Sequence, residues 1–148
     1  SYYNETKLLK SFEIKEFSFL YIIINNSNLI NQNIHLIENV RLYSAENKQL
    51  FKEILKQSQN LSNFDIKKIN LDHELIKRVN NYASVKHIIK KYKNDDSKIL
   101  EIFSEIIQDL KNYELEQRIL ELESKFSEDL SETTFNELKQ LKKLQKIN

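Results

Sequence analysis

Apolar residues recur at helical spacing along most of the chain, and their first group lies in residues 15–26. This segment is apolar nearly all round and follows a polar lead-in of Glu13, Lys15 and Glu16. Its β-branched isoleucines would also suit a buried strand. Its length and lead-in favour a buried central helix, and the asparagine and serine run at 25–28 predicts its end. The apolar residues are Phe17, Phe19, Leu20, Tyr21, Ile22, Ile23 and Ile24.

A second helix is predicted for residues 45–59. It follows Ser44, a good N-cap residue, and it has lysine and glutamate on the face opposite its apolar residues. Those apolar residues are Leu50, Phe51, Ile54 and Leu55. The remaining predicted helices of a compact bundle cover residues 64–69, 72–82 and 84–93.

The longest predicted helix covers residues 97–126 and follows Asp95 and Asp96, whose charge suits the positive end of a helix dipole. It carries two apolar stripes that advance by alternating steps of four and three. The second stripe starts two residues after the first ends, which at about 100° per residue turns the stripe by roughly 200°. One helix is therefore expected to serve two cores. The stripes are Ile99, Phe103, Ile106, Leu110 and Tyr113, then Leu115, Ile119, Leu122 and Phe126.

A helical hairpin is predicted to close the chain. Residues 127–129 are its polar connection, Leu130 follows, and Ser131 is a candidate N-cap for a last helix that runs towards Lys146. The lysines late in that helix match the helix dipole. The side chains expected to pack against the second stripe are Phe135, Leu138 and Leu141.

These patterns predict an all-α protein in which a helical bundle (1–112) is joined by a long helix to a C-terminal helical hairpin (113–148). The expected hinge is at Asn112, Tyr113 and Glu114. Because the apolar core of the hairpin is thin, we expect the hairpin to present a surface to another molecule.

Composition excludes several kinds of chemistry. The 148 residues include no glycine, proline, cysteine, methionine or tryptophan. Without glycine there is no phosphate-cradling loop, and without cysteine there is no thiolate zinc site, thiol nucleophile or disulfide. No nucleophile, base and orienting group can be assembled, so we expect no catalytic residue, no cofactor and no enzymatic activity.

Candidate metal ligands are scattered. His35, His73 and His87 lie far apart, and the neighbours Asp72 and Glu74 of His73 point to different faces of a helix. Carboxylate pairs such as 114 with 116 are spaced by two and splay apart in the same way. We therefore expect no metal site.

A basic segment is the best candidate for contact with nucleic acid. Lys86, Lys90 and Lys93 follow helical spacing there, and Lys91 and Tyr92 lie among them. One tyrosine is not a stacking platform, and a net charge of +1 gives little general attraction to phosphate. An ordinary basic surface is the simpler interpretation.

The ends and the apolar runs bear on location. The chain starts at Ser1 and has no methionine, which suggests a segment of a longer protein. Its longest apolar run, residues 17–24, is far shorter than the ~20 residues needed to cross a bilayer, and no signal sequence opens the chain. We expect a cytoplasmic protein.

The order of these segments resembles the C-terminal domain of DnaG-type bacterial primases. Residues 15–29 resemble that family's charged, then leucine-rich, then "N-H-P-x-L" opening, with Ser27 in place of the family's proline. Tyr43 and Ser44, followed by an apolar helix, resemble its capped "F-S-x-x-x" helix. Residues 120–122 and 129–132, with the leucine-spaced tail, resemble its closing hairpin.

The resemblance implies a non-catalytic recruiter that docks primase onto the N-terminal collar of the hexameric DnaB-type helicase and modulates it. We expect a monomer on its own, no small-molecule substrate and no membrane partner. The hairpin is predicted to carry most of the docking, because apolar anchors ringed by charge suit a reversible interface. The predicted contact residues are Leu141, Lys142, Leu144, Gln145, Lys146 and Ile147.

Two alternatives stay open. The chain could be a helical nucleic-acid-binding domain that uses the basic segment, or a scaffold similar to the N-terminal domain of DnaB helicases. The DnaB domain resembles the bundle, but it lacks a long helix that ends in a terminal hairpin.

Overall fold

The computed structural model describes residues 10–60 and 71–147, and every regular element in those residues is a helix. The predicted all-α class is therefore confirmed. The chain divides into two compact units, a bundle unit (Ser1–Leu110) and a hairpin unit (Lys111–Asn148). This division lies close to the boundary predicted after residue 112.

Helix α2 (Ser11–Asn25) is the predicted central helix, and every residue from 16 to 24 in it is buried. It begins earlier than the sequence pattern predicts. At its end, the side-chain amides of Asn25 and Asn26 donate to the carbonyls of Tyr21 (2.9 Å) and Ile22 (3.2 Å). These bonds satisfy carbonyls at the C-terminal end of the helix, which explains why the asparagine run ends it. Helix α3 (Ser27–Gln32) follows at once and was not predicted.

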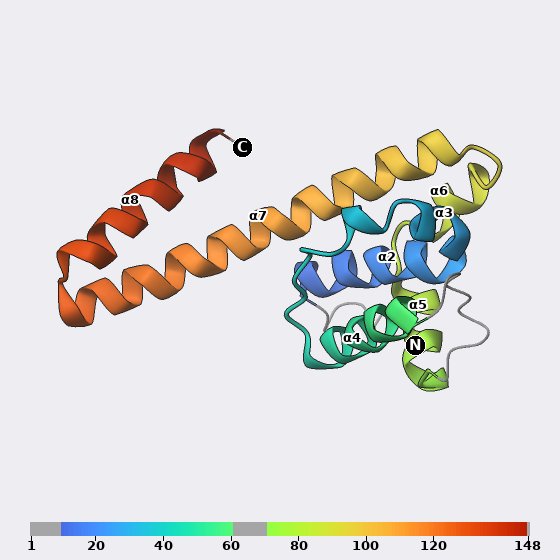
Figure 1. Ribbon diagram of the computed structural model, residues 1–148, viewed down its shortest axis with the longest axis horizontal. Helices are drawn as coiled ribbons and strands as arrows, with labels where there is room; N and C mark the ends of the chain where they lie inside the picture. Colours follow the sequence, from blue (N-terminus) through green and yellow to red (C-terminus); the bar gives the residue numbers. More distant parts are fainter. Residues whose placement is uncertain (1–9, 61–70, 148) are drawn as a thin grey trace. The chain divides into compact units, whose positions relative to one another are not determined.

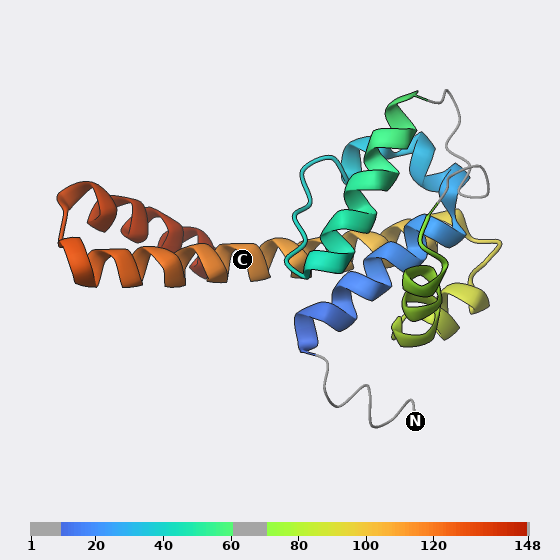
Figure 2. The ribbon, with the colours of Figure 1, turned by 90° about the horizontal axis from the view of Figure 1, so that it is seen from below.

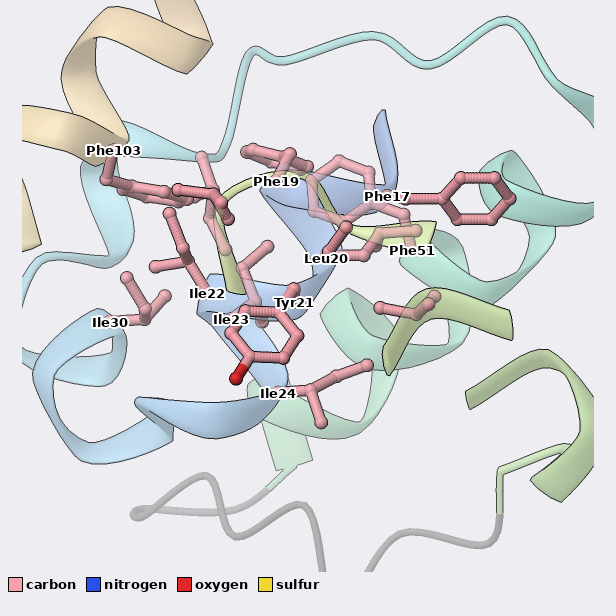
Figure 3. Packing of buried hydrophobic residues seen from close by; sticks show 14 of the residues in the cluster. Phe17, Phe19, Leu20, Tyr21, Ile22, Ile23, Ile24, Ile30, Phe51 and Phe103 are labelled. Atoms are coloured by element: carbon pink, nitrogen blue, oxygen red, sulfur yellow. The ribbon is translucent and has the colours of Figure 1, made fainter. Parts of the chain in front are cut away.

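The bundle unit is built around α2. Figures 1 and 2 show α3, α4 (Ala45–Asn60), α5 (His73–Tyr82), α6 (Lys86–Lys91) and the first part of α7 (Asp96–Asp129) around it. A short 3-10 helix (Ile34–Leu36) follows α3. Phe19 of α2 stacks on Phe103 of α7 with ring centroids 5.4 Å apart, and it meets Phe51 of α4 edge-on at 5.2 Å (Figure 3). These ring contacts join three helices in one core.

Glu16 lies inside this core, although the sequence analysis assigned it to a polar lead-in. It is 1% exposed, and its carboxylate accepts hydrogen bonds from the backbone N–H groups of Tyr43 (2.6 Å) and Ser44 (3.2 Å) and from the Asn47 amide (3.1 Å). Glu16 therefore joins α2 to the N-terminal end of α4, where a negative charge is favourable. Burial raises the pKa of this carboxyl, and the three hydrogen bonds act in the opposite direction.

The remaining helices of the bundle unit differ from their predictions mainly at their ends. Helix α4 begins directly after Ser44, as predicted. Helix α5 begins after Asp72, whose carboxylate accepts from the backbone N–H groups of Glu74 (3.0 Å) and Leu75 (3.4 Å) as its N-cap. Helix α6 is shorter than the predicted 84–93. The helix predicted for residues 64–69 lies outside the described residues.

The long helix is confirmed as α7. Asp95 caps it by accepting from the backbone N–H of Lys98 at 3.1 Å, as its acidic lead-in predicts. Its buried residues up to Leu110 belong to the core cluster of the bundle unit, whereas Ile119 is buried outside that cluster. The two apolar stripes thus contribute to separate interiors. Asn112, Tyr113 and Glu114 lie within the continuous helix, and their role as a hinge stays a prediction.

Candidate protein-docking site

The hairpin unit consists of the second part of α7, a tight turn and α8 (Glu132–Ile147). The predicted polar connection at 127–129 is wrong, because these residues continue α7 to Asp129. Polar residues alone do not end a helix, and no glycine or proline interrupts this one. The helix ends at Leu130, which has a φ of 49° and donates its N–H to the carbonyl of Phe126 at 2.7 Å. Many helices end in this way, with a residue in the left-handed region whose N–H donates to the carbonyl four residues earlier.

Ser131 caps α8, as the sequence predicts. Its hydroxyl oxygen accepts from the backbone N–H of Thr134 at 3.2 Å and lies 2.7 Å from the Thr134 hydroxyl oxygen, to which it donates. Helix α8 then runs back along α7 (Figure 1). The rings of Phe126 and Phe135 approach to 5.6 Å, and Leu138 is buried, so the predicted inner face of the hairpin is present.

A groove of about 500 Å³ lies between the two helices of the hairpin unit. Ile119 and Leu120 supply its apolar surface. Its polar surface comes from Glu116, Glu123, Lys142, Gln145 and Lys146. An ion pair between Lys142 Nζ and Glu123 (2.9 Å) bridges the helices at this groove. An apolar strip with charged groups beside it is the composition expected of a reversible protein interface.

The structure places three of the six predicted contact residues at this groove. Lys142, Gln145 and Lys146 line the groove, while Leu141 is half-buried. Leu144 is 51% exposed and Ile147 80% exposed, so both project apolar surface that nothing in the hairpin unit covers. No observation tests whether these six residues touch a partner.

Leu120 is a groove residue that the sequence analysis missed. It is 57% exposed and falls outside the stripe that contains Ile119 and Leu122. An apolar residue that lies off the buried stripe of an amphipathic helix is expected to be exposed. Its position off the stripe could therefore have identified Leu120 from the sequence.

The two units differ in the number of large apolar side chains that they expose. Six large apolar side chains are exposed in the described part of the chain, and five of them belong to the hairpin unit although it is the smaller unit. Ile88 is the sixth and stands alone on α6. The five are Leu120, Leu130, Phe135, Leu144 and Ile147. Leu130 and Phe135 lie near the turn, whereas Leu144 and Ile147 lie at the other end of α8, so the candidate docking surface is the end of α8 beside the groove.

The candidate metal ligands stay apart in the part of the chain that the structure describes. Within residues 10–60 and 71–147, no three histidine, aspartate or glutamate side chains gather as a metal site. His35, His73 and His87 are all exposed, and Asp72 is engaged as the cap of α5. None of the described helices is both long enough and apolar enough to span a membrane.

The basic segment is partly ordinary helix surface. Ile89 of α6 is buried in the bundle core, and Lys90, Lys91 and Lys93 are exposed. Tyr92 is half-buried and lies beneath the ammonium of Lys91 at 5.3 Å, so its ring is already covered on one face. This arrangement leaves exposed charge and little aromatic surface for a base.

No protein-family model, curated protein or solved structure gives a match to this chain.

Proposed function

We propose that this chain is the helicase-interaction domain of a bacterial DnaG-type primase, and that it docks primase onto the N-terminal collar of the replicative DnaB-type helicase. In this role the chain is non-catalytic, acts in the cytoplasm and needs no cofactor. The segment order that resembles the primase domain supports the proposal. The exposed Leu144 and Ile147 beside the groove carry it, because apolar side chains that nothing in the hairpin unit covers suit contact with a partner.

The groove and the end of α8 would form the contact. Leu144 and Ile147 provide apolar anchors, and the lysines beside them provide charge at the rim. Truncating apolar anchors at the centre of an interface typically costs at least about 2 kcal/mol, or more than about tenfold in affinity.

Titration of the replicative helicase from the same organism tests the proposal. The double variant Leu144→Asp, Ile147→Asp should weaken binding by more than about tenfold while the circular dichroism spectrum stays unchanged. Ile88→Asp is the matched control, since it places the same charge at an exposed apolar position of the bundle unit and should leave the affinity as it is. Equal losses in both variants, or no binding by the wild type, would contradict the proposal.

Nucleic-acid binding through Lys90, Lys91 and Lys93 is the second candidate function, favoured by the exposure of all three. Binding through phosphates should weaken steeply as salt rises, because each neutralised phosphate releases counterions. Docking through leucine and isoleucine should depend less on salt. A titration with single-stranded DNA at two salt concentrations separates the two functions.

A further inference from the structure

A second pocket lies on the bundle unit, whose surface the proposed docking does not use. It has a volume of about 510 Å³ and is formed by α4 and by α5 with the two residues before it. Leu50 and Leu71 are buried beneath it, and Leu75 is half-buried. The pocket therefore has an apolar floor large enough for one or two aliphatic side chains.

The rim of this pocket is acidic. Among the described residues, four carboxylates and one cation line it, and the cation, Arg78, is paired with Glu46. Asp72 is held as the cap of α5. Glu53 and Glu74 have no ion-pair or hydrogen-bond partner for their carboxylates among the described residues. A ligand of this pocket should therefore combine an apolar side chain with positive charge.

The end of α8 has this chemistry. Residues 138–148 contain four lysines and no acidic residue. Lys143 is exposed and forms no ion pair with a described residue. The exposed Ile147 lies one turn further on the same face, and the exposed Leu144 lies about 100° around the helix from Lys143. The apolar and cationic groups thus project from the same two turns, as the apolar floor and acidic rim of the pocket require.

We infer that the pocket of the bundle unit receives the end of α8 from a second copy of this chain. The contact is head-to-tail, because the donor and acceptor surfaces differ, so each pair of copies keeps one free pocket and one free α8 end. It covers the residues proposed to bind the helicase, and self-association therefore competes with that docking. The monomer expected from the sequence stays a prediction, and the experiments below decide between it and this inference.

Sedimentation velocity across a concentration series tests this inference without any other protein. The weight-average mass of the wild type should rise with concentration and fall back as salt is added. Glu53→Lys should weaken self-association by roughly tenfold or more, since it replaces an attraction with a repulsion. Glu105→Lys, at an exposed acid of the bundle unit outside the pocket, is the matched control and should associate as the wild type does.

A mixing experiment tests the head-to-tail arrangement. Chains with Glu53→Lys keep an intact α8, and chains with Leu144→Asp, Ile147→Asp keep an intact pocket. Each variant alone should associate roughly tenfold or more weakly than the wild type, and an equimolar mixture should form a heterodimer at concentrations where each variant alone is monomeric. Lys143→Glu should restore association of the Glu53→Lys variant with itself, because the charges are exchanged.

Three outcomes overturn the inference. The wild type could stay monomeric at every concentration, which would leave the pocket to some other ligand. The Glu53→Lys variant could associate as the wild type does, or the mixture could form no heterodimer. Loss of helicase binding in the Leu144→Asp, Ile147→Asp variant bears on the proposed function alone.

Discussion

Glu16 is the only buried acidic or basic residue among the described residues. It is important to the fold because its carboxylate accepts hydrogen bonds from three donors. Replacing it by alanine would leave the N–H groups of Tyr43 and Ser44 and the Asn47 amide without their acceptor. Each buried donor left in this state costs about 1–3 kcal/mol.

We expect Glu16→Ala to lower the free energy of unfolding by about 2–4 kcal/mol. Glu13→Ala removes a carboxylate from the preceding turn of the same helix and should cost less than about 1 kcal/mol. Urea denaturation of the two variants provides the measurement. A loss of the same size in both would show that the hydrogen bonds of Glu16 are not what stabilises this region.

The raised pKa of Glu16 also predicts a pH dependence. Because the folded state holds this proton more tightly than the unfolded chain, the stability contributed by the group is complete below its usual pKa of 4.5 and is lost as pH rises through the higher folded value. Glu16→Gln cannot ionise. Denaturation of both proteins at several pH values should show the stability of the wild type relative to Glu16→Gln declining as pH rises from 4.5. A constant or rising difference would contradict this assignment.

Sequence reasoning missed Glu16 because it treated the residue as part of a solvated lead-in. The signal was present: a helix that is buried on every side from 17 to 24 continues its burial one residue further, and a charge there must find partners. The partners could not be predicted, since residues 43–47 approach α2 only through the tertiary fold.

At the scale of whole elements, periodicity and caps predicted most helices, because apolar spacing depends on local geometry. Asp95 and Ser131 cap helices as predicted, whereas Asp72, predicted to lie inside a helix, caps α5. The prediction that residues 127–129 lie outside the helix failed because their residue types do not decide where a helix ends. Serine, glutamate and aspartate can end or continue a helix, and the choice depends on where the chain can adopt a left-handed residue. Three of the six predicted contact residues line the groove, but the places of Leu120 and of the pocket of the bundle unit depend on how the helices pack.

The turn at Leu130 provides an element-scale prediction. A residue with a side chain pays about 1–2 kcal/mol to adopt the left-handed region, and Leu130 is 69% exposed, so little packing offsets that cost. Leu130→Gly should stabilise the hairpin by about 1 kcal/mol, raising the temperature at which α8 melts. Leu130→Ala keeps the Cβ and should bring no comparable gain. Thermal unfolding followed by circular dichroism compares the two, and equal effects would rule out backbone conformation as the cause.

At the scale of the whole molecule, the two units have very different interiors. All members of the core cluster lie between residues 17 and 110, whereas Ile119, Thr134 and Leu138 are the buried residues of the described hairpin. A fragment of residues 1–110 should therefore melt cooperatively, and a peptide of residues 111–148 should be mostly unfolded, because a pair of helices with so small a core is marginal in water. Circular dichroism of both fragments measures this. A stable isolated hairpin would refute it.

The small interior of the hairpin should let it open often, and a bound partner should reduce this opening. A segment that is only weakly held in its folded form opens locally without disturbing the rest of the protein, so its amide hydrogens should exchange with solvent far sooner than those of α2. A molecule that binds only the folded form of the hairpin stabilises that form by its binding free energy. Slower exchange along α8 on complex formation, with α2 unchanged, would therefore report occupancy of the hairpin directly.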